Sequence, residues 1–247
     1  ASLVGSEMCI RDSFMRHDIR SLIIYEDPHI IVCRKPAGVP TQSARISTPD
    51  MASMLKNYLS GGYLAVIHRL DQPVEGLLVF AKTPGAAREL NRQLTSSGFG
   101  KYYRAIVSGI PEPSEVTLED YMVKDARANA SRICTKNTPG AKAARLHYRV
   151  EKIFRDTSPV TSLVAIHLDT GRHHQIRVQM AHIGCPLVGD RKYGTAYSSP
   201  AHTASGENIS QAHVGNTGPL RLCAYRLEFR HPANRKLMTF SLSENPW

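Results

Sequence analysis

The segment from residue 63 to residue 82 constrains this chain most, because a charged turn lies between two apolar runs. The runs cover residues 63–67 and 76–81, and both are short, rich in Val, Ile, Leu and Phe, and bounded by Gly or Pro. This pattern predicts two buried strands. Asp71 lies in the turn, with Arg69 before it and Pro73 after it. Two interpretations stay open at this point: an ion-paired turn at the end of a sheet, or a functional carboxylate.

The charge balance favours a polyanionic partner. The 247 residues include 31 Lys and Arg against 21 Asp and Glu, a formal net charge of +10. Displacement of counterions from phosphates by such a surface drives binding to nucleic acid without regard to sequence. Charge alone raises this expectation without deciding it. The 42% hydrophobic content is ordinary for a globular protein and excludes wholesale disorder.

The cysteines predict neither a disulfide framework nor a zinc site, because they are odd in number and widely spread. They are Cys9, Cys33, Cys134, Cys185 and Cys223. No apolar run approaches the roughly 20 residues that a membrane-spanning helix needs. We therefore expect a soluble cytoplasmic protein that has no membrane partner, with a monomer as the default.

The domain organisation is predicted to be simple. Residues 1–14 show neither helical nor strand periodicity, so we expect a non-native or disordered leader, with Met15 as the natural start. Residues 15–247 contain no internal repeat and no separating linker, which predicts a single domain. Residues 194–219 are rich in Gly, Ser, Thr and Ala and predict a long loop, of the kind that is often functional or mobile.

Periodicity along the rest of the chain predicts strands and three helices. Strands are expected at residues 22–25, 29–33, 101–108, 146–150, 162–169, 221–229 and 237–242. One helix follows a cap at Ser47 or Thr48, and another follows Thr83. A third begins after the turn at 170–172, where Arg177 is predicted at the border of a buried stripe. Residues 124–145 predict a basic surface loop or hairpin.

Three side chains are candidates for chemistry. Asp71 is the carboxylate, Arg177 a counter-charge, and Tyr103 an aromatic or hydroxyl partner. In the strand at 101–108, however, either Tyr102 or Tyr103 could face a cleft. Sequence spacing alone does not bring these residues together.

Four motifs, in order, carry a resemblance to a known family. The stretch His68-Arg69-Leu70-Asp71, followed by Gly76-Leu77-Leu78-Val79 and Ala81-Lys82, resembles the catalytic motif of the RluA-like RNA pseudouridine synthases. The other motifs are Lys35-Pro36-Ala37-Gly38, Lys101-x-Tyr103-x-Ala105, and Thr170-Gly171-Arg172-His173-His174-Gln175-Ile176-Arg177-Val178 running on to Gly189-Asp190. The resemblance extends from about residue 23 to residue 242.

The resemblance implies an α/β fold of the α+β type, with a mixed, mostly antiparallel central sheet and flanking helices and loops around a catalytic cleft. It implies isomerisation of uridine to pseudouridine in ribosomal or transfer RNA, a reaction that needs no cofactor and no metal. Asp71 would attack C1′ or remove a sugar proton, and these routes stay open. Arg177 would pair with Asp71, and Tyr103 would stack on the target base.

The resemblance also implies RNA contacts around a uridine that leaves its stack. Arg69 has the planar head to occupy the vacated space, with a phosphate contact or a structural salt bridge as the alternative. Arg172 and the basic segment 124–145 would bind the RNA backbone. His68, His174 and Gln175 complete the predicted RNA-binding set, the last two as supports of the residues that touch RNA.

The chain departs from the family pattern at Val74 and Glu75, where many members carry Thr-Ser. About 20 residues precede the first strand, which predicts a stand-alone catalytic domain without an N-terminal S4 domain. Two other functions stay open. One is an RNA-binding module without catalysis. The other is a metal-dependent hydrolase that uses His167, Asp169, His173 and His174, although the adjacent His173 and His174 would point apart.

Overall fold

The computed structural model describes residues 18–43, 48–96, 98–194, 218–243 and 247. The elements in chain order are α2 (Ile19–Leu22), β1 (Ile23–Glu26), β2 (Ile30–Lys35), α3 (Met51–Tyr58), β3 (Ala65–Val66), β4 (Glu75–Ala81), α4 (Pro84–Thr95), β5 (Gly100–Ser108), β6 (Glu115–Asp125), β7 (Ala130–Cys134), β8 (Lys142–Phe154), β9 (Thr161–Leu168), α5 (Gln175–His182), β10 (Leu222–Arg230) and β11 (Leu237–Ser241). The predicted leader at 1–14 and most of the predicted loop at 194–219 lie outside the described residues.

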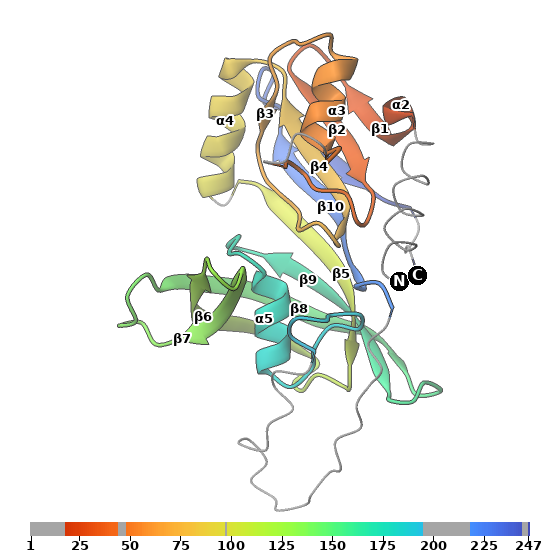
Figure 1. Ribbon diagram of the computed structural model, residues 1–247, viewed down its shortest axis with the longest axis vertical. Coiled ribbons are helices and arrows are strands. Elements are labelled where there is room, and N and C mark those ends of the chain that lie inside the picture. Colours follow the sequence, from red (N-terminus) through yellow and green to blue (C-terminus); the bar gives the residue numbers. More distant parts are fainter. Residues whose placement is uncertain (1–17, 44–47, 97, 195–217, 244–246) are drawn as a thin grey trace, which may run out of the picture. The chain divides into compact units, whose positions relative to one another are not determined.

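The strands pair in the order β1-β2-β4-β10-β5-β9-β8-β6-β7, with β3 also on β4 and β11 also on β10 (Figure 1). The pairs whose register is resolved are antiparallel, so the predicted α+β class with a mostly antiparallel sheet is confirmed. The chain divides into two compact units. We call residues 1–100 and 224–245 the N-terminal unit, and residues 101–223 and 246–247 the central unit. A single domain over 15–247 stays a prediction.

Helix α4 shows how the N-terminal unit builds its core. Thr83 accepts a hydrogen bond from the Ala86 N–H at 3.2 Å, and Pro84 occupies the first turn, as predicted. Ala86 and Leu90 then face the sheet, where they are buried with apolar side chains of β2, β4 and β10. In Figure 1 this helix lies beside β3 and β4. The 3.6-residue spacing of small and apolar residues therefore closes one face of the sheet.

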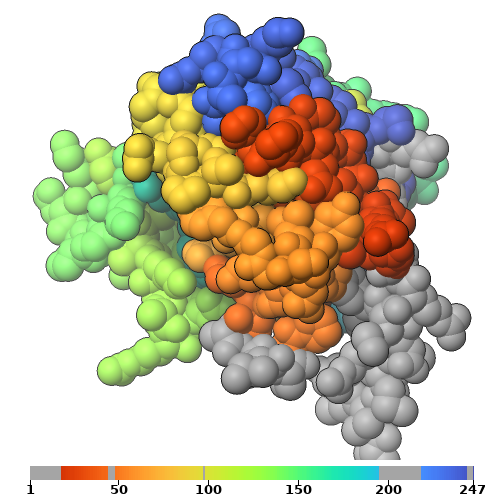
Figure 2. Space-filling view, turned by 90° about the horizontal axis from the view of Figure 1, so that it is seen from above, coloured from red at the N-terminus to blue at the C-terminus, as the bar shows by residue number. Residues whose placement is uncertain are grey.

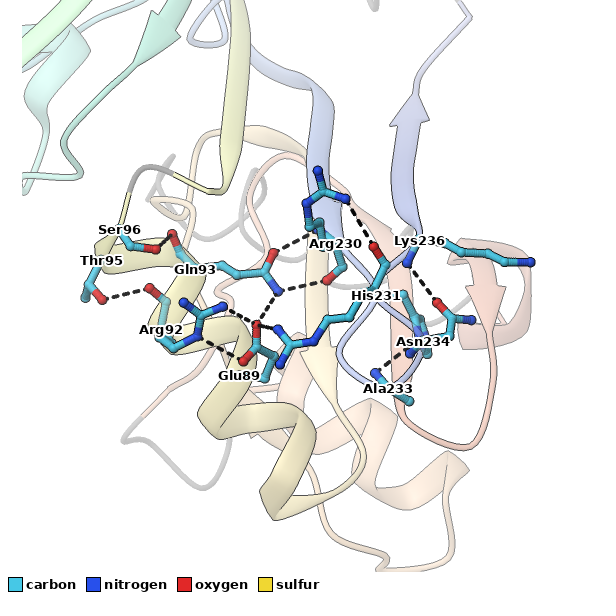
Figure 3. A network of polar contacts seen from close by, with 11 residues as sticks. Glu89, Arg92, Gln93, Thr95, Ser96, Arg230, His231, Ala233, Asn234 and Lys236 are labelled. Atoms are coloured by element: carbon cyan, nitrogen blue, oxygen red, sulfur yellow. Dashed lines mark hydrogen bonds and ion pairs between the residues drawn. The ribbon is translucent and has the colours of Figure 1, made fainter.

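The surface of α4 is fastened to the end of β10 by polar side chains (Figure 3). The Gln93 side chain accepts from the Arg230 N–H at 2.8 Å and donates to the Arg230 carbonyl at 2.9 Å. Glu89 pairs with Arg92 at 2.8 Å and also with Arg235. Figure 2 shows α4 and the β10–β11 segment side by side on one face. This network fixes the edge of the unit from outside its core.

Three sequence predictions for the N-terminal unit were wrong in detail. The helix predicted after Ser47 or Thr48 begins at Met51, and its cap is Asp50, which accepts from the Ser53 N–H at 2.8 Å. The strand predicted at 63–67 shrinks to the two residues of β3. Residue 22, predicted as strand, ends the one-turn helix α2, which is too short to produce a periodic pattern.

In the central unit, β5, β9, β8, β6 and β7 form consecutive antiparallel pairs. The alternation predicted for 101–108 is confirmed, because Tyr103, Ala105 and Val107 are buried on one face of β5. The basic segment 124–145 forms the β6–β7 hairpin and the start of β8, so of the two predicted forms the hairpin is observed. Helix α5 is buried from Gln175 to Ala181 on every side, rather than along one stripe. In the described part of the chain, no helix has the length and apolar character needed to cross a membrane.

Gly76 is required where β4 begins. Its φ is +131°, and a Cβ there would lie 2.4 Å from the Ala224 carbonyl oxygen. We predict that Gly76→Ala lowers the free energy of unfolding by about 2–4 kcal/mol, because both the backbone and its neighbour must shift. Urea denaturation measures this change. Gly85→Ala in α4 is the control: its Cβ would meet nothing within 4 Å. It should leave stability unchanged or raise it by about 0.5–1 kcal/mol, and equal losses in both variants would contradict the assignment.

Candidate active site

The loop that carries Asp71 is held by a buried ammonium group. The Lys35 side chain has no solvent exposure, and its Nζ donates to the carbonyls of Gln72 at 3.0 Å, Val39 at 2.6 Å and Pro36 at 3.0 Å. Three acceptors match the three N–H donors of an ammonium. Burial lowers the pKa of Lys35 to about 7, although the charges of Asp71 and Glu75 act to raise it. Lys35 thus fixes the backbone next to Asp71 and places a positive charge near its carboxylate.

A second anchor fixes the residue before Asp71. The buried Thr41 hydroxyl donates to the Leu70 carbonyl at 3.0 Å and accepts from the Leu70 N–H at 3.1 Å. On the other side, the Gly38 N–H donates to the Gln72 carbonyl at 2.9 Å. Asp71 itself is half-buried, and its carbonyl closes a turn with the Val74 N–H at 3.0 Å. The backbone is therefore fixed on both sides of the carboxylate.

Arg69 and His68 differ sharply in exposure. Arg69 is exposed, and its guanidinium contacts the Gln42 side chain at 3.1 Å. His68 is half-buried: its Nε2 lies 3.4 Å from the Val79 N–H, and its ring is edge-on to Phe99. Arg69 can therefore reach a ligand in solvent, whereas His68 supports the loop from the protein side.

The departure from the family pattern now has a structural description. Val74 is buried with 2% exposure, so it belongs to the packing behind the loop. Glu75 pairs with Arg34 at 3.2 Å across β4 and β2. Its carboxylate is therefore largely buried and held in an ion pair.

Tyr103 lies on β5, opposite Ile166 of β9, and is 6% exposed. Tyr102 points to the other face of the strand, where its ring stacks on His167 at 4.8 Å between centroids. The two tyrosines that the sequence left as alternatives therefore have different neighbours.

Arg177 forms a bidentate ion pair inside the central unit. Its Nε and Nη2 donate to the two carboxylate oxygens of Asp190, both at 2.7 Å. Burial alone would raise the pKa of Asp190, but the hydrogen bonds and charge of Arg177 outweigh it, and the pKa lies below its ordinary value. Arg177 also lies over the Tyr193 ring at 5.1 Å. The predicted semi-buried position was wrong: Arg177 is 7% exposed and held in one orientation.

His174 and His173 belong to the support of this arginine. The Tyr193 hydroxyl accepts from the Ser131 N–H at 2.9 Å and is hydrogen-bonded to His174 Nδ1 at 2.7 Å. His173 Nδ1 lies 2.9 Å from the Ser131 hydroxyl. Burial is the largest cause that lowers the pKa of both histidines, to about 3 for His174 and about 4 for His173. The charge of Arg177 lowers the pKa of His174 further, and the charges of nearby lysines lower that of His173. Both rings are therefore neutral at pH 7.

Gln175 and Arg172 hold the turn before α5. The Gln175 Oε1 accepts from the Thr170 hydroxyl at 2.8 Å and the Arg172 N–H at 2.9 Å, and its Nε2 donates to the Arg145 carbonyl at 3.1 Å. Arg172 Nε donates to the Ala143 carbonyl at 2.7 Å. Gln175 is 3% exposed, so its contacts are those of a turn support, while Arg172 reaches the surface.

The residues considered for a metal-dependent hydrolase have other contacts. His173 and His174 do not point apart as predicted, because their rings stack with centroids 3.7 Å apart. This follows from the left-handed backbone of His174, with φ of 56°. His167 pairs with Asp169 at 3.3 Å. Over the described residues, no three His, Cys, Asp or Glu side chains are placed to share a metal ion.

Sequence reasoning missed three residues that position the site. Thr41 carries no motif signal. Asp190 stood at the end of the arginine motif, but only its place in the pattern was noted. Tyr193, three residues further on, could have been found as the next aromatic residue after that motif. Their roles depend on contacts between distant segments, which spacing does not reveal.

Comparison with known proteins places this fold and these motifs in one class. A family model described as RNA pseudouridylate synthase matches residues 29–182. The solved structure of human RNA pseudouridylate synthase domain containing 4 superposes with a TM-score of 0.68 at 24% identity, over 92% of this chain and 91% of that chain. Human RNA pseudouridylate synthase domain containing 1 gives a TM-score of 0.65 at 23% identity, over 90% and 82%. At these identities the superpositions show the fold alone.

Sequence relatives show to which family within this class the chain belongs. Ribosomal large subunit pseudouridine synthase D of Pseudomonas aeruginosa is 34% identical over 80% of this chain and 61% of its own length. Dual-specificity RNA pseudouridine synthase RluA of Salmonella typhimurium is 32% identical over 90% of this chain and 92% of its own length. The chain therefore belongs to the RluA-like family of RNA pseudouridine synthases, a family of isomerases. It spans about three fifths of the length of the first relative.

The Thr41 anchor can be tested without an activity assay. Thr41→Val keeps the shape of the side chain but leaves the Leu70 N–H and carbonyl without their partner. We predict that the free energy of unfolding falls by about 1–3 kcal/mol and that hydrogen exchange of the Leu70 amide accelerates. Thr41→Ser retains the hydroxyl and should preserve most of the protection. Unchanged Leu70 exchange in Thr41→Val would show that the hydroxyl does not hold the loop.

The neutral histidines predict a pH dependence of stability. Their folded-state pKa values, about 4 and about 3, lie below the ordinary value of 6.5. The unfolded chain therefore binds protons first as the pH falls, and stability is lost below pH 6.5. We expect the Tm to fall between pH 6.5 and pH 5, before most carboxylates titrate. His173→Asn, which keeps a polar group able to hydrogen-bond Ser131, should flatten this slope. A wild-type Tm that stays constant over this interval would contradict the prediction.

Proposed function

We propose that this chain isomerises uridine to pseudouridine in RNA, with Asp71 as the reacting carboxylate. The observation that carries the proposal is the family match over residues 29–182, which includes Asp71, Tyr103 and Arg177. The fixed backbone around Asp71 supports it, because a carboxylate that attacks C1′ or removes a sugar proton must be held within a few tenths of an ångström. The uracil leaves through N1, turns, and is rejoined through C5, so no atom is gained or lost.

In this proposal Arg177 keeps Asp71 ionised and aimed, and Asp190 keeps Arg177 in place. The side-on pair with Asp190 uses Nε and one N–H of Nη2, and a guanidinium has five N–H donors. In this proposal the same arginine serves two carboxylates at once. Tyr103 stacks on the target base, and its buried position on β5 gives that ring a fixed orientation.

The proposed substrate is large-subunit ribosomal RNA, because several relatives carry that substrate in their names. Transfer RNA is the alternative. Arg69 occupies the space that the extruded uridine leaves, a role that suits an exposed planar cation on a fixed loop. Arg172 and the basic β6–β7 hairpin bind the backbone. The enzyme acts as a cytoplasmic monomer in this proposal.

Asp71→Asn tests the assignment directly. We expect the variant to fold and to bind RNA, while pseudouridine formation in unmodified large-subunit ribosomal RNA falls by at least about 10³-fold, because an amide is neither a nucleophile nor a base at neutral pH. Base-specific carbodiimide labelling with primer extension measures the product and maps its position. Repeating the assay on transfer RNA separates the two substrates.

The matched control is Glu75→Gln, which makes the same carboxylate-to-amide change four residues away. It loses the Arg34 ion pair, whose arginine is half-exposed, and should retain activity within a few fold. Product formation by Asp71→Asn at the wild-type rate would remove Asp71 from its role. Loss in Glu75→Gln alone would move the chemistry to a different carboxylate.

A further inference from the structure

Lys101 is a buried cation that the proposed reaction does not use. It lies on β5, two residues before Tyr103 and on the same face, and is 7% exposed. Among the residues that the structure describes, none accepts a hydrogen bond from its Nζ, in contrast to Lys35, whose Nζ has three acceptors. Its Nζ is not among the fully buried atoms that lack a partner, so the ammonium borders solvent and an anion from outside the chain can bind it.

The Lys101 Nζ lies against the turn before α5. A Cβ placed on Gly171 would be 3.3 Å from it, so the glycine leaves the ammonium covered by backbone alone on that side. Gly171 itself is exposed, so a ligand can approach the turn from solvent. Burial lowers the pKa of Lys101, the positive charge of Arg172 lowers it further, and Asp169 acts to raise it. Two cations thus lie close together at one exposed glycine.

The nearby carboxylate is shared with other partners. Asp169 pairs with Arg145 at 3.1 Å, and its second oxygen lies 3.3 Å from His167 Nδ1. Arg172 is fixed through its Nε on the Ala143 carbonyl, which orients the guanidinium of this half-buried side chain. A fixed guanidinium and an ammonium beside a glycine form a receptor for a tetrahedral dianion or diester, because the two cations can donate to different oxygens.

We propose that Lys101 and Arg172, across Gly171, bind one phosphate of the RNA backbone. Only the identification of the ligand as RNA rests on the proposed function. Residues two apart on a strand are separated by roughly 7 Å, about the length of one nucleotide. The phosphate bound by Lys101 is therefore that of the nucleotide whose base meets Tyr103, or its immediate neighbour. Lys101 thus positions the target nucleotide by its phosphate while Tyr103 contacts its base.

Lys101→Met separates this role from a structural one, because the two predict opposite changes. Methionine keeps the apolar stem and removes a buried charge, so thermal stability should be unchanged or higher. RNA binding should weaken about tenfold at 0.1 M salt, and the slope of log K against log salt concentration should become shallower by about one unit. The probe is unmodified large-subunit ribosomal RNA, and binding is measured in the Asp71→Asn background so that no turnover occurs.

Two further variants complete the experiment. Lys56→Met removes an exposed lysine of α3 and should leave both affinity and salt slope unchanged. Lys101→Arg retains the charge and should keep the wild-type salt slope. Wild-type affinity and slope in Lys101→Met would overturn the proposal, and so would a parallel loss of stability and binding, which indicates a structural lysine. If wild-type protein forms no pseudouridine while Lys101→Met still alters the salt slope, the proposed function fails and the phosphate site stands.

Discussion

The candidate site depends on one buried ammonium. Lys35, at the end of β2, donates to three carbonyl oxygens. Two belong to the loop that follows β2, and the third belongs to Gln72, 37 residues along the chain from Lys35. A loop of this kind has no ladder hydrogen bonds of its own, so its backbone groups must be satisfied from outside. The charge that performs this task also lies near Asp71 and Glu75. One side chain therefore sets both the shape and the electrostatics of the loop.

In the central unit, a buried arginine is stabilised by polar groups around it in a comparable way. Arg177 lies on a helix buried on all sides, where an uncompensated guanidinium would be strongly destabilising. Asp190 supplies the carboxylate, and the N–H groups of Lys192 and Tyr193 bind the same carboxylate at 2.9 and 3.1 Å. Neutral His174 and Tyr193 complete the environment without adding charge. The arginine is thus held in one orientation by contacts within the chain alone.

Sequence patterns predicted the parts of the fold that local rules govern. The cap at Thr83, the helix after Pro84 and the alternation along β5 follow from capping and periodicity and were confirmed. The family and fold class followed from four ordered motifs. The cap at Asp50 is local but was missed, because Ser47 and Thr48 offered other capping side chains just before it. The shortening of β3 and the complete burial of α5 were missed because each depends on segments far along the chain. Thr41 was missed for the same reason, because its two hydrogen bonds join it to Leu70, 29 residues along the chain.

The unusual Val74–Glu75 pair changes both the apolar volume and the charge behind the loop that carries Asp71. Val74 adds apolar volume behind the loop and is covered almost completely. Glu75 adds a negative charge beside Lys35, but Arg34 on the neighbouring strand offsets it. Val74 therefore packs into the core, and Glu75 forms an ion pair that joins two strands. The substitution therefore changes how the loop is supported from behind, while Asp71 in the same loop stays half-buried.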